Sequence, residues 1–496
     1  MGIITRQGFK HTVVNYVGAA IGLLTTLFVY PLQMEAYGLA QFLMATAVLF
    51  IPLTVLGAQS LPIRFFHRFE DPENGHNGFI NWLLLLCLGG GLLTAGLTWI
   101  FWERIIAYYA TVSPLYPLYL IFFLPILILR GVIQVLNTYI SNFHRIVVPS
   151  ILNDLLIKIT LPVFVLLVYS GWWSYRELVI GLVLHFVAVF LGLIIYLNLL
   201  GHWSLRINWP AFKGPILGEM REFAVYGILG SMGASVAMNL DIFMISSMIS
   251  PEATGIYSIA AVMANLINRP LIAITAISAP IIMKAWKEGN RREIETIYQK
   301  SAINSLIPGV LLFLLIVLNL QDLYALMPNS DVVRTNELAL ILLGGAYLIN
   351  LATGVNAEMM VYSDLFKWHF YTVLILALLN FILNFFLIRS MGITGAALAT
   401  LISYTVYNLC KGGIVWYKHR MHPFTPAMMW LLILSVSVGL VFLYLPIPGP
   451  AWLAIGLRSI LMVGMFTLGM LKLAISAEAS SLIGRVWTMV KERVHF

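Results

Sequence analysis

Charged side chains that stand inside long apolar stretches are the residues of this sequence most suited to bind a ligand. Arg269 is the clearest case, since Asn265 and Asn268 precede it on the same side of a helix. An ionised group at the centre of a bilayer costs about 2.5–3.5 kcal/mol on insertion scales, so it normally faces a bundle interior or a wet cavity. A guanidinium presents paired, planar donors that suit phosphate. We therefore predict that these three residues bind an anionic substrate; the alternative is a structural arginine, paired with a carboxylate or with backbone carbonyls.

Two more basic residues lie in apolar stretches. Arg130 begins a narrow polar stripe that continues with Gln134 and Asn137, one and two helical turns further on. Lys158 follows Asp154 by four residues, and this acid-first order favours a pair within one helix. We predict that Arg130 and Lys158 also contact the substrate, and the alternative for Lys158 is that it only neutralises Asp154.

Asp154 and Asp241 are acidic residues of the apolar stretches, and either could take up H⁺ or Na⁺ from an ion gradient. Asp241 could equally be the counter-ion of Arg269. The sequence has no metal-ligand spacing, no phosphate-binding glycine loop before a helix and no Ser/His/Asp set in a large loop. We therefore expect no enzyme, no catalytic residues, no metal and no cofactor beyond a coupling ion, H⁺ or Na⁺.

The composition explains where these residues must lie. Of the 496 residues, 60% are apolar and only 10% are charged, whereas soluble domains carry about 25% charged residues. A chain this apolar must have lipid as most of its solvent. The net charge of +8 is spread over short loops without a dense patch, so a nucleic-acid partner is not expected.

Apolar runs of about 20 residues are long enough to cross a bilayer as helices. The sequence predicts an all-α, polytopic membrane protein with about fourteen such spans. Their approximate limits are 12–32, 39–61, 79–102, 115–139, 147–169, 177–200, 222–248, 255–283, 301–320, 335–358, 368–388, 391–410, 426–445 and 451–471.

The distribution of basic residues predicts the orientation of these spans. With the N-terminus in the cytoplasm, 21 of the 29 Lys and Arg residues fall on the cytoplasmic side and four on the opposite side. This bias is a strong positive-inside signal and places both termini in the cytoplasm. The basic segment 284–300 is predicted to be a helix lying on the cytoplasmic membrane surface.

An internal repeat is visible in the sequence. The stretches that begin at Tyr37 and Thr254 each have glycine at the second position, Gly38 and Gly255, and each has two prolines ten residues apart. Six predicted spans separate the copies, so the repeats would be parallel; chance similarity of apolar sequence is the alternative. We predict an N-terminal lobe of spans 1–6 (1–200), a C-terminal lobe of spans 7–12 (201–424), and spans 13–14 with a cytoplasmic tail (425–496).

Two stretches resemble a known family. They are NFILNFFLIRSMGITGAALATLISY, residues 380–404, and LDIFMISSMISPEATGIYSIA, residues 240–260. Both are similar to the polysaccharide-biosynthesis flippases, which carry lipid-linked oligosaccharides and belong to the multidrug/oligosaccharidyl-lipid/polysaccharide exporter superfamily. The resemblance extends over most of the chain in span number, lobe repeat and loop lengths.

The resemblance implies two six-helix lobes around a central cavity that opens alternately to either side of the bacterial inner membrane. The implied substrate is an undecaprenyl-pyrophosphate-linked oligosaccharide repeat unit, moved for polysaccharide, O-antigen or capsule export. The family has cationic residues in the cavity, a description that Arg269 and Arg130 fit. The implied partners are the lipid-linked oligosaccharide, the lipid bilayer, and polysaccharide polymerase and chain-length proteins.

Three other functions remain open. A multidrug cation antiporter would favour acidic residues in its cavity, and the first span, Val13–Leu32, has none. A flippase for the lipid precursor of peptidoglycan shares the predicted architecture. A membrane-embedded sugar polymerase usually has a large periplasmic loop, and the loops of this sequence are short.

Overall fold

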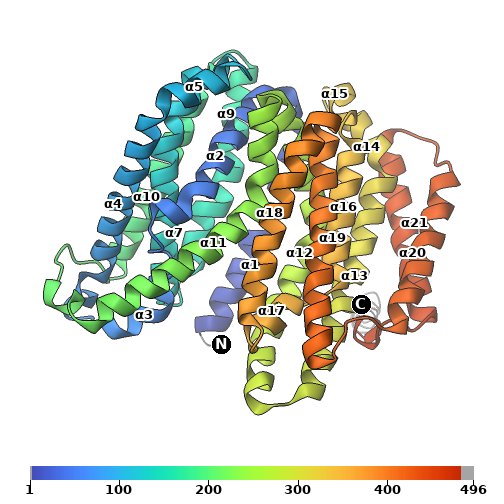
Figure 1. Cartoon of the computed structure of the whole chain (residues 1–496). Coiled ribbons are helices and arrows are strands. Elements are labelled where there is room, and N and C mark those ends of the chain that lie inside the picture. The colour runs from blue at the N-terminus through green and yellow to red at the C-terminus, as the bar shows by residue number, and fades with distance from the viewer. Residues whose placement is uncertain (1–2, 482–496) are drawn as a thin grey trace, which may run out of the picture. The chain divides into compact units, whose positions relative to one another are not determined.

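The structure is a computed structural model that describes residues 3–481, without the side chains of residues 3–9, 12, 234, 237 and 238. Every regular element in this part of the chain is helical (Figure 1). Twelve of its helices are long and apolar enough to cross a membrane. The two other predicted spans coincide with α11 (Pro215–Met248) and α16 (Glu337–Ala352). The all-α, polytopic fold class is thus confirmed.

The chain divides into two compact units, Met1–Ile259 and Ala260–Phe496, called unit 1 and unit 2 below. The division falls within α12 (Pro251–Glu288). The lobe limits near residues 200 and 424 stay a prediction. Before α12, unit 1 contains, besides α11, α1 (Ile3–Phe28), α2 (Met34–Thr54), α3 (Leu61–Phe69), α4 (Phe79–Ile100), α5 (Trp102–Ala110), α6 (Leu115–Tyr119), α7 (Phe123–Ser141), α8 (Val147–Ser150), α9 (Leu156–Tyr169) and α10 (Tyr175–Leu199).

Helix α2 is the most deeply buried span of unit 1 and packs against α7 and α11. Its N-terminal turn meets the start of α12 through two glycines. A Cβ on Gly38 would lie 1.7 Å from the Pro251 carbonyl oxygen, and one on Gly255 would lie 2.2 Å from that of Met34. The glycines that occupy the same position in the two copies of the repeat therefore let two backbones touch.

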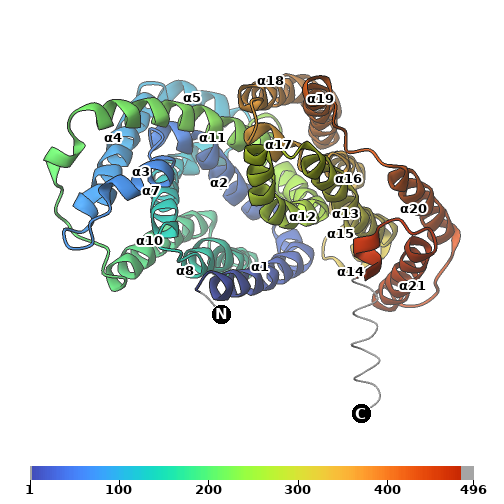
Figure 2. The same ribbon diagram turned by 90° about the horizontal axis from the view of Figure 1, so that it is seen from below.

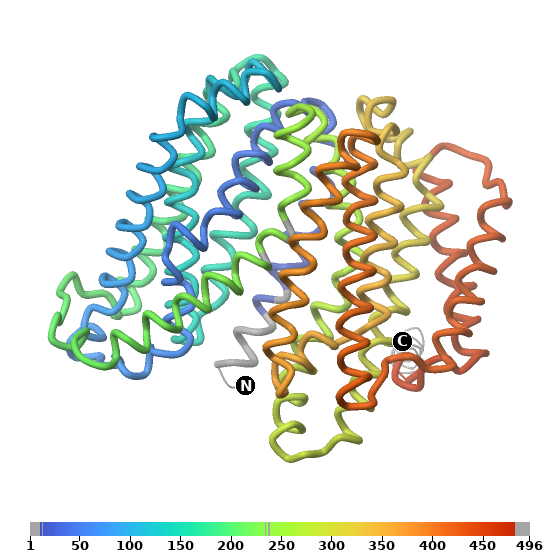
Figure 3. The backbone as a smooth tube through the Cα atoms, in the orientation of Figure 1, coloured from blue at the N-terminus to red at the C-terminus, as the bar shows by residue number. Residues whose placement is uncertain are grey.

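In unit 2 the long helices run beside one another. Besides α16 they are α13 (Arg291–Leu318), α18 (Phe366–Met391), α19 (Ile393–His419), α20 (Pro426–Tyr444) and α21 (Ala451–Lys472); shorter ones are α14 (Leu320–Leu326), α15 (Ser330–Arg334) and α17 (Asn356–Val361). Figure 3 follows the chain along α18 and back along α19, which pack closely.

The prediction that segment 284–300 forms a helix of its own on the membrane surface is wrong. This segment is not a separate surface helix: α12 continues to Glu288, Gly289 turns the chain at φ +68°, and α13 starts at Arg291. Its basic residues instead cover the exposed ends of two long helices. Lys284, for example, is 74% exposed and lies 3.7 Å from Glu288.

The last two spans are held to α13 and α14 within unit 2 (Figure 2). An apolar cluster joins α13, α20 and α21 around Leu431, Val438 and Met462. Arg458 of α21 donates to the Asp322 carboxylate at 2.5 Å and to the Leu318 carbonyl at 3.1 Å.

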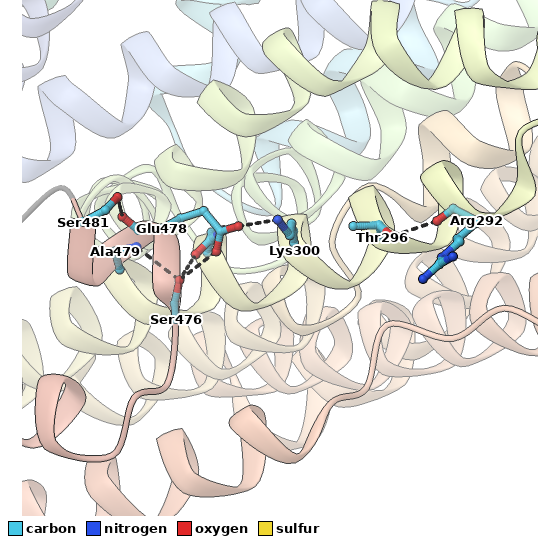
Figure 4. A network of polar contacts seen from close by, with 8 residues as sticks. Arg292, Thr296, Lys300, Ser476, Glu478, Ala479 and Ser481 are labelled. Carbon is cyan, nitrogen blue, oxygen red and sulfur yellow. Dashed lines mark hydrogen bonds and ion pairs between the residues drawn. The ribbon is translucent and has the colours of Figure 1, made fainter.

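After α21 the chain returns to α13 through a polar network (Figure 4). The Ser476 hydroxyl donates to Asn304 Oδ1 at 2.7 Å and accepts from the Ala479 N–H at 3.2 Å. Glu478 forms an ion pair with Lys300 at 2.5 Å. These contacts fix the end of the described chain beside the first turns of α13.

Candidate functional site

Arg269 of α12 is an exposed side chain of unit 2. Within the described part of the chain it makes no hydrogen bond or ion pair. Its two asparagine neighbours are held by α16: Asn265 donates to the Tyr347 hydroxyl at 3.4 Å, and Asn268 accepts from the Asn350 amide at 3.3 Å. The structure therefore anchors this helical segment through its amides and leaves the guanidinium available to a ligand.

The span that contacts these asparagines is interrupted by a polar break. Helix α16 ends at Ala352 and α17 begins at Asn356, with Gly354 between them at φ +52°. Thr353 donates to Asn408 of α19 at 2.8 Å. Discontinuous spans with polar breaks are a recurring feature of substrate and ion sites in transporters.

Sequence reasoning missed Lys411, which it counted in a cytoplasmic loop. The structure places Lys411 inside α19 with only 2% of the residue exposed. Its ammonium lies 3.9 Å from the centroid of the Tyr407 ring and interacts electrostatically with Glu358 of α17. The predicted span ended at residue 410, just before Lys411, whereas the apolar spacing that continues through Ile414 and Val415 is the signal that could have placed it correctly.

Arg130 of α7 is half-buried in unit 1. Its Nη1 donates to the Met44 carbonyl of α2 at 3.1 Å, and its guanidinium lies 5.4 Å from the centroid of the Phe186 ring. Stacking on an aromatic ring and donation to a carbonyl both hold a guanidinium in place. Its contact with substrate stays a prediction.

A π-helical turn, Ile151–Leu155, interrupts the span between α8 and α9 and carries Asp154. Asn153 in this turn donates to Asn137 of the Arg130 stripe at 2.9 Å, and also to the Pro149 carbonyl at 2.7 Å. Asp154 is exposed and accepts from the Ser150 hydroxyl at 2.9 Å. Single π-turns inside helices occur frequently at functional sites.

Lys158 lies against two glycines of α1. A Cβ on Gly18 would be 3.2 Å from the Lys158 Nζ, and one on Gly22 would be 3.7 Å from its Cδ. The missing side chains form a shallow groove on α1 along which the lysine extends. We call Arg130, the π-turn and Lys158 together the polar strip of unit 1. The contact between Asn153 and Asn137 joins its first two parts.

Asp241 of α11 accepts a hydrogen bond from the Tyr257 hydroxyl at 2.7 Å. Its role in ion coupling, like that of Asp154, stays a prediction. In the described residues no three His, Cys, Asp or Glu side chains gather in a way that could hold a metal ion.

Comparison with known proteins finds a matching family model and several similar solved structures. The model of the polysaccharide biosynthesis protein family matches residues 4–286. A search of curated proteins found no match. Among solved structures, the lipid II flippase MurJ in an inward closed conformation is similar, with 14% identity and a TM-score of 0.72, over 94% of this chain and 99% of that one.

Two transporters of the MOP superfamily are also similar. One is an inward-facing multidrug resistance MATE family transporter, with 16% identity and a TM-score of 0.62 over 81% of this chain and 94% of that one. The other comes from Pyrococcus furiosus, with 14% identity and a TM-score of 0.56 over 84% and 95%. At these identities the likeness establishes the fold, which is that of polytopic membrane transporters.

Proposed function

Because this chain belongs to the polysaccharide biosynthesis protein family, we propose that it moves undecaprenyl-pyrophosphate-linked oligosaccharide repeat units across the bacterial inner membrane. The movement serves the export of a polysaccharide, O-antigen or capsule. In this proposal the protein acts by alternating access, with both termini in the cytoplasm. Polysaccharide polymerase and chain-length proteins would receive the transported unit.

The observation that carries this proposal is that the charge of Arg269 has no compensating partner within the described chain. A cation on a membrane-spanning helix is expensive unless something compensates its charge. Arg269 is exposed and has no partner in the described chain, while Asn265 and Asn268 beside it are already anchored to α16. A pyrophosphate would supply the missing compensation with charge-assisted hydrogen bonds.

The polar strip of unit 1 supports the same substrate class. Arg130, Lys158 and the amides near them present donors to an anionic, hydroxyl-rich head group, and Asp154 or Asp241 would exchange the coupling ion, H⁺ or Na⁺. A multidrug antiporter for cations would instead need carboxylates where these two basic residues stand.

The test is transport by purified protein in vesicles that contain the lipid-linked oligosaccharide. We expect the double variant Arg269→Ala, Arg130→Ala to lose most of the transport, whereas Arg176→Ala, an exposed arginine at the start of α10, transports normally. Normal transport by the double variant would overturn the proposal.

The same vesicles separate the rival substrates. Vesicles that contain the lipid precursor of peptidoglycan, or a fluorescent drug cation, replace the oligosaccharide in parallel assays. Transport of either one in preference to the oligosaccharide would assign the protein to that rival function.

A further inference from the structure

A cavity lies within unit 1, lined by residues that do not belong to the polar strip. It has a volume of about 510 Å³ and walls from α2, α4 and α5, with Phe123 of α7 and Phe243 of α11 completing them. Binding sites for small molecules commonly measure about 300–1,000 Å³. The cavity is therefore large enough to hold a ligand of substantial size.

The lining of this cavity is apolar and aromatic. No charged side chain contributes to it, and its rings include Phe50, Phe101, Phe123 and Phe243. Two of its threonine hydroxyls, those of Thr94 and Thr98, donate to backbone carbonyls of their own helix at 2.9 and 2.8 Å.

Thr46 is the exception in this lining. The residue is 5% exposed, and its hydroxyl has no hydrogen-bond partner within the described part of the protein. A buried hydroxyl without a partner is unfavourable, because it has lost its hydrogen bonds to water and gained none in return. A ligand that offers an acceptor at this point would remove that penalty.

The cavity is continuous with the lipid-facing surface of α4. Leu93 and Leu97 line it and are 57% and 50% exposed, and Leu92 on the same helix is 74% exposed. Because α4 is long and apolar enough to span the membrane, its exposed leucines contact hydrocarbon. A hydrocarbon chain would thus enter from the bilayer without crossing water.

We propose that this cavity binds a segment of a polyisoprenoid chain, the lipid anchor of the substrate. The inference rests on the proposed function, which supplies such a chain. Carbon–carbon double bonds recur along an isoprenoid, so one of them can accept the Thr46 hydroxyl as a weak O–H···π donor in any register of the chain. A saturated acyl chain offers no acceptor.

The test is photolabelling of the full-length protein in phospholipid nanodiscs. One probe is a polyprenyl monophosphate with a diazirine on its isoprenoid chain, and the other is a phospholipid with a diazirine on a saturated acyl chain. Mass spectrometry maps the labelled residues. We expect the polyprenyl probe to label the lining of α4 and α5 in preference to the acyl probe.

Three variants test whether the labelling depends on the cavity and on the Thr46 hydroxyl. Leu97→Trp fills the cavity and should lower its polyprenyl labelling about tenfold, while Leu92→Trp, outside the lining on the same helix, should leave it unchanged. Thr46→Val keeps the side-chain shape, and it should lower polyprenyl labelling but not acyl labelling. Equal labelling by both probes, or labelling that is insensitive to Leu97→Trp and Thr46→Val, would overturn the inference.

The two proposals fail in distinguishable ways. The polyprenyl probe carries no sugar and is not transported, so its labelling tests the cavity alone. Labelling as expected in a protein that moves no oligosaccharide would contradict the proposed function and leave the cavity assignment in place. Transport of oligosaccharide by a protein whose cavity is never labelled would contradict only the cavity assignment.

Discussion

Two cations of unit 2 differ in what the fold provides for them. Lys411 is buried against the Tyr407 ring and has Glu358 as a counter-charge, whereas Arg269 is exposed and has no partner in the described chain. A buried cation that already has partners is costly to disturb, because removing either one leaves the other uncompensated. The exposed guanidinium can exchange partners, and this makes Arg269 the better candidate for a transported ligand.

Replacing Arg269 by lysine tests whether the planar donor pair of the guanidinium matters in addition to its positive charge. Lysine keeps the positive charge but loses the planar pair of donors. We expect Arg269→Lys to raise the KM for the lipid-linked substrate about tenfold, as the loss of one charge-assisted hydrogen bond of about 1.5 kcal/mol would. Initial transport rates over a range of substrate densities measure this. A KM equal to that of the unaltered protein would show that no bidentate contact forms.

The ion pair between Lys300 and Glu478 makes the docking of the C-terminal segment sensitive to acid. The hydrogen bond from Lys300 lowers the pKa of Glu478 below its usual value near 4.5. The contribution of a group with a lowered pKa is complete above its unfolded-state pKa and is lost as the pH falls through its folded-state pKa. Both side chains are about half exposed, so the effect is small and sensitive to salt.

We therefore expect segment 476–481 to open more often as the pH falls below about 4.5. Hydrogen exchange at the Ala479 amide, corrected for the intrinsic rate, reports this because that N–H donates to Ser476. Glu478→Gln should show the faster exchange already at pH 7, while Glu295→Gln on α13 should not. Unchanged hydrogen exchange at the Ala479 amide in Glu478→Gln would show that the ion pair does not hold this segment in place.

At the scale of single residues, the sequence was informative where polar groups repeat on one side of a helix. Asn265 and Asn268 do contact one neighbouring helix together. Lys411 was misplaced for a physical reason: Glu358, the carboxylate that compensates its charge, is distant in sequence. Periodicity along one helix carries no information about such partners.

The contact between the starts of α2 and α12 depends on two residues without side chains. A methyl group on Gly38 would overlap the Pro251 carbonyl and force the two helices apart. We expect Gly38→Ala to destabilise the protein by about 1–3 kcal/mol, the usual range for overpacking. Thermal unfolding in detergent measures the change. Gly96→Ala on α4, where no atom lies within 4 Å of the added carbon, is the matched control and should unfold at the normal temperature.

Most helices were predictable as elements, because runs of about 20 apolar residues have few alternatives. Their ends were less predictable. The charged residues near 284–300 suggested a surface helix, but the left-handed turn at Gly289 joins two long helices directly. The break at Gly354 was also missed, because a tether from Ser301 on another helix determines it: the Val355 N–H donates to that hydroxyl at 3.3 Å.

For the molecule as a whole, the basic residues predict the side on which each loop lies. The sequence assigned 21 of the 29 Lys and Arg residues to one side, and 20 of them remain there once Lys411 is placed inside α19. We therefore expect both termini to be cytoplasmic. A fluorescent protein fused to the C-terminus should therefore be bright, and alkaline phosphatase fused after Arg334 should be active. Activity of the phosphatase at the C-terminus instead would reverse the assigned orientation.

The fold class of the whole chain followed from composition, but the site did not. Hydropathy identifies spans without saying which polar groups meet across them. The contact of Asn153 with Asn137, and the groove of Gly18 and Gly22 that holds Lys158, both depend on packing between helices. Such packing is specific to each bundle and cannot be obtained from one sequence.

The π-turn at Ile151–Leu155 changes the direction in which the side chains after it point. A turn closed by i→i+5 bonds contains one residue more than its α-helical equivalent, so the angular phase of the helix shifts there. The rule that residues four apart face the same way therefore does not carry across it. Asp154 lies within this turn and Lys158 lies in α9 directly after it, so a one-residue deletion in the turn would change the direction of one side chain relative to the other.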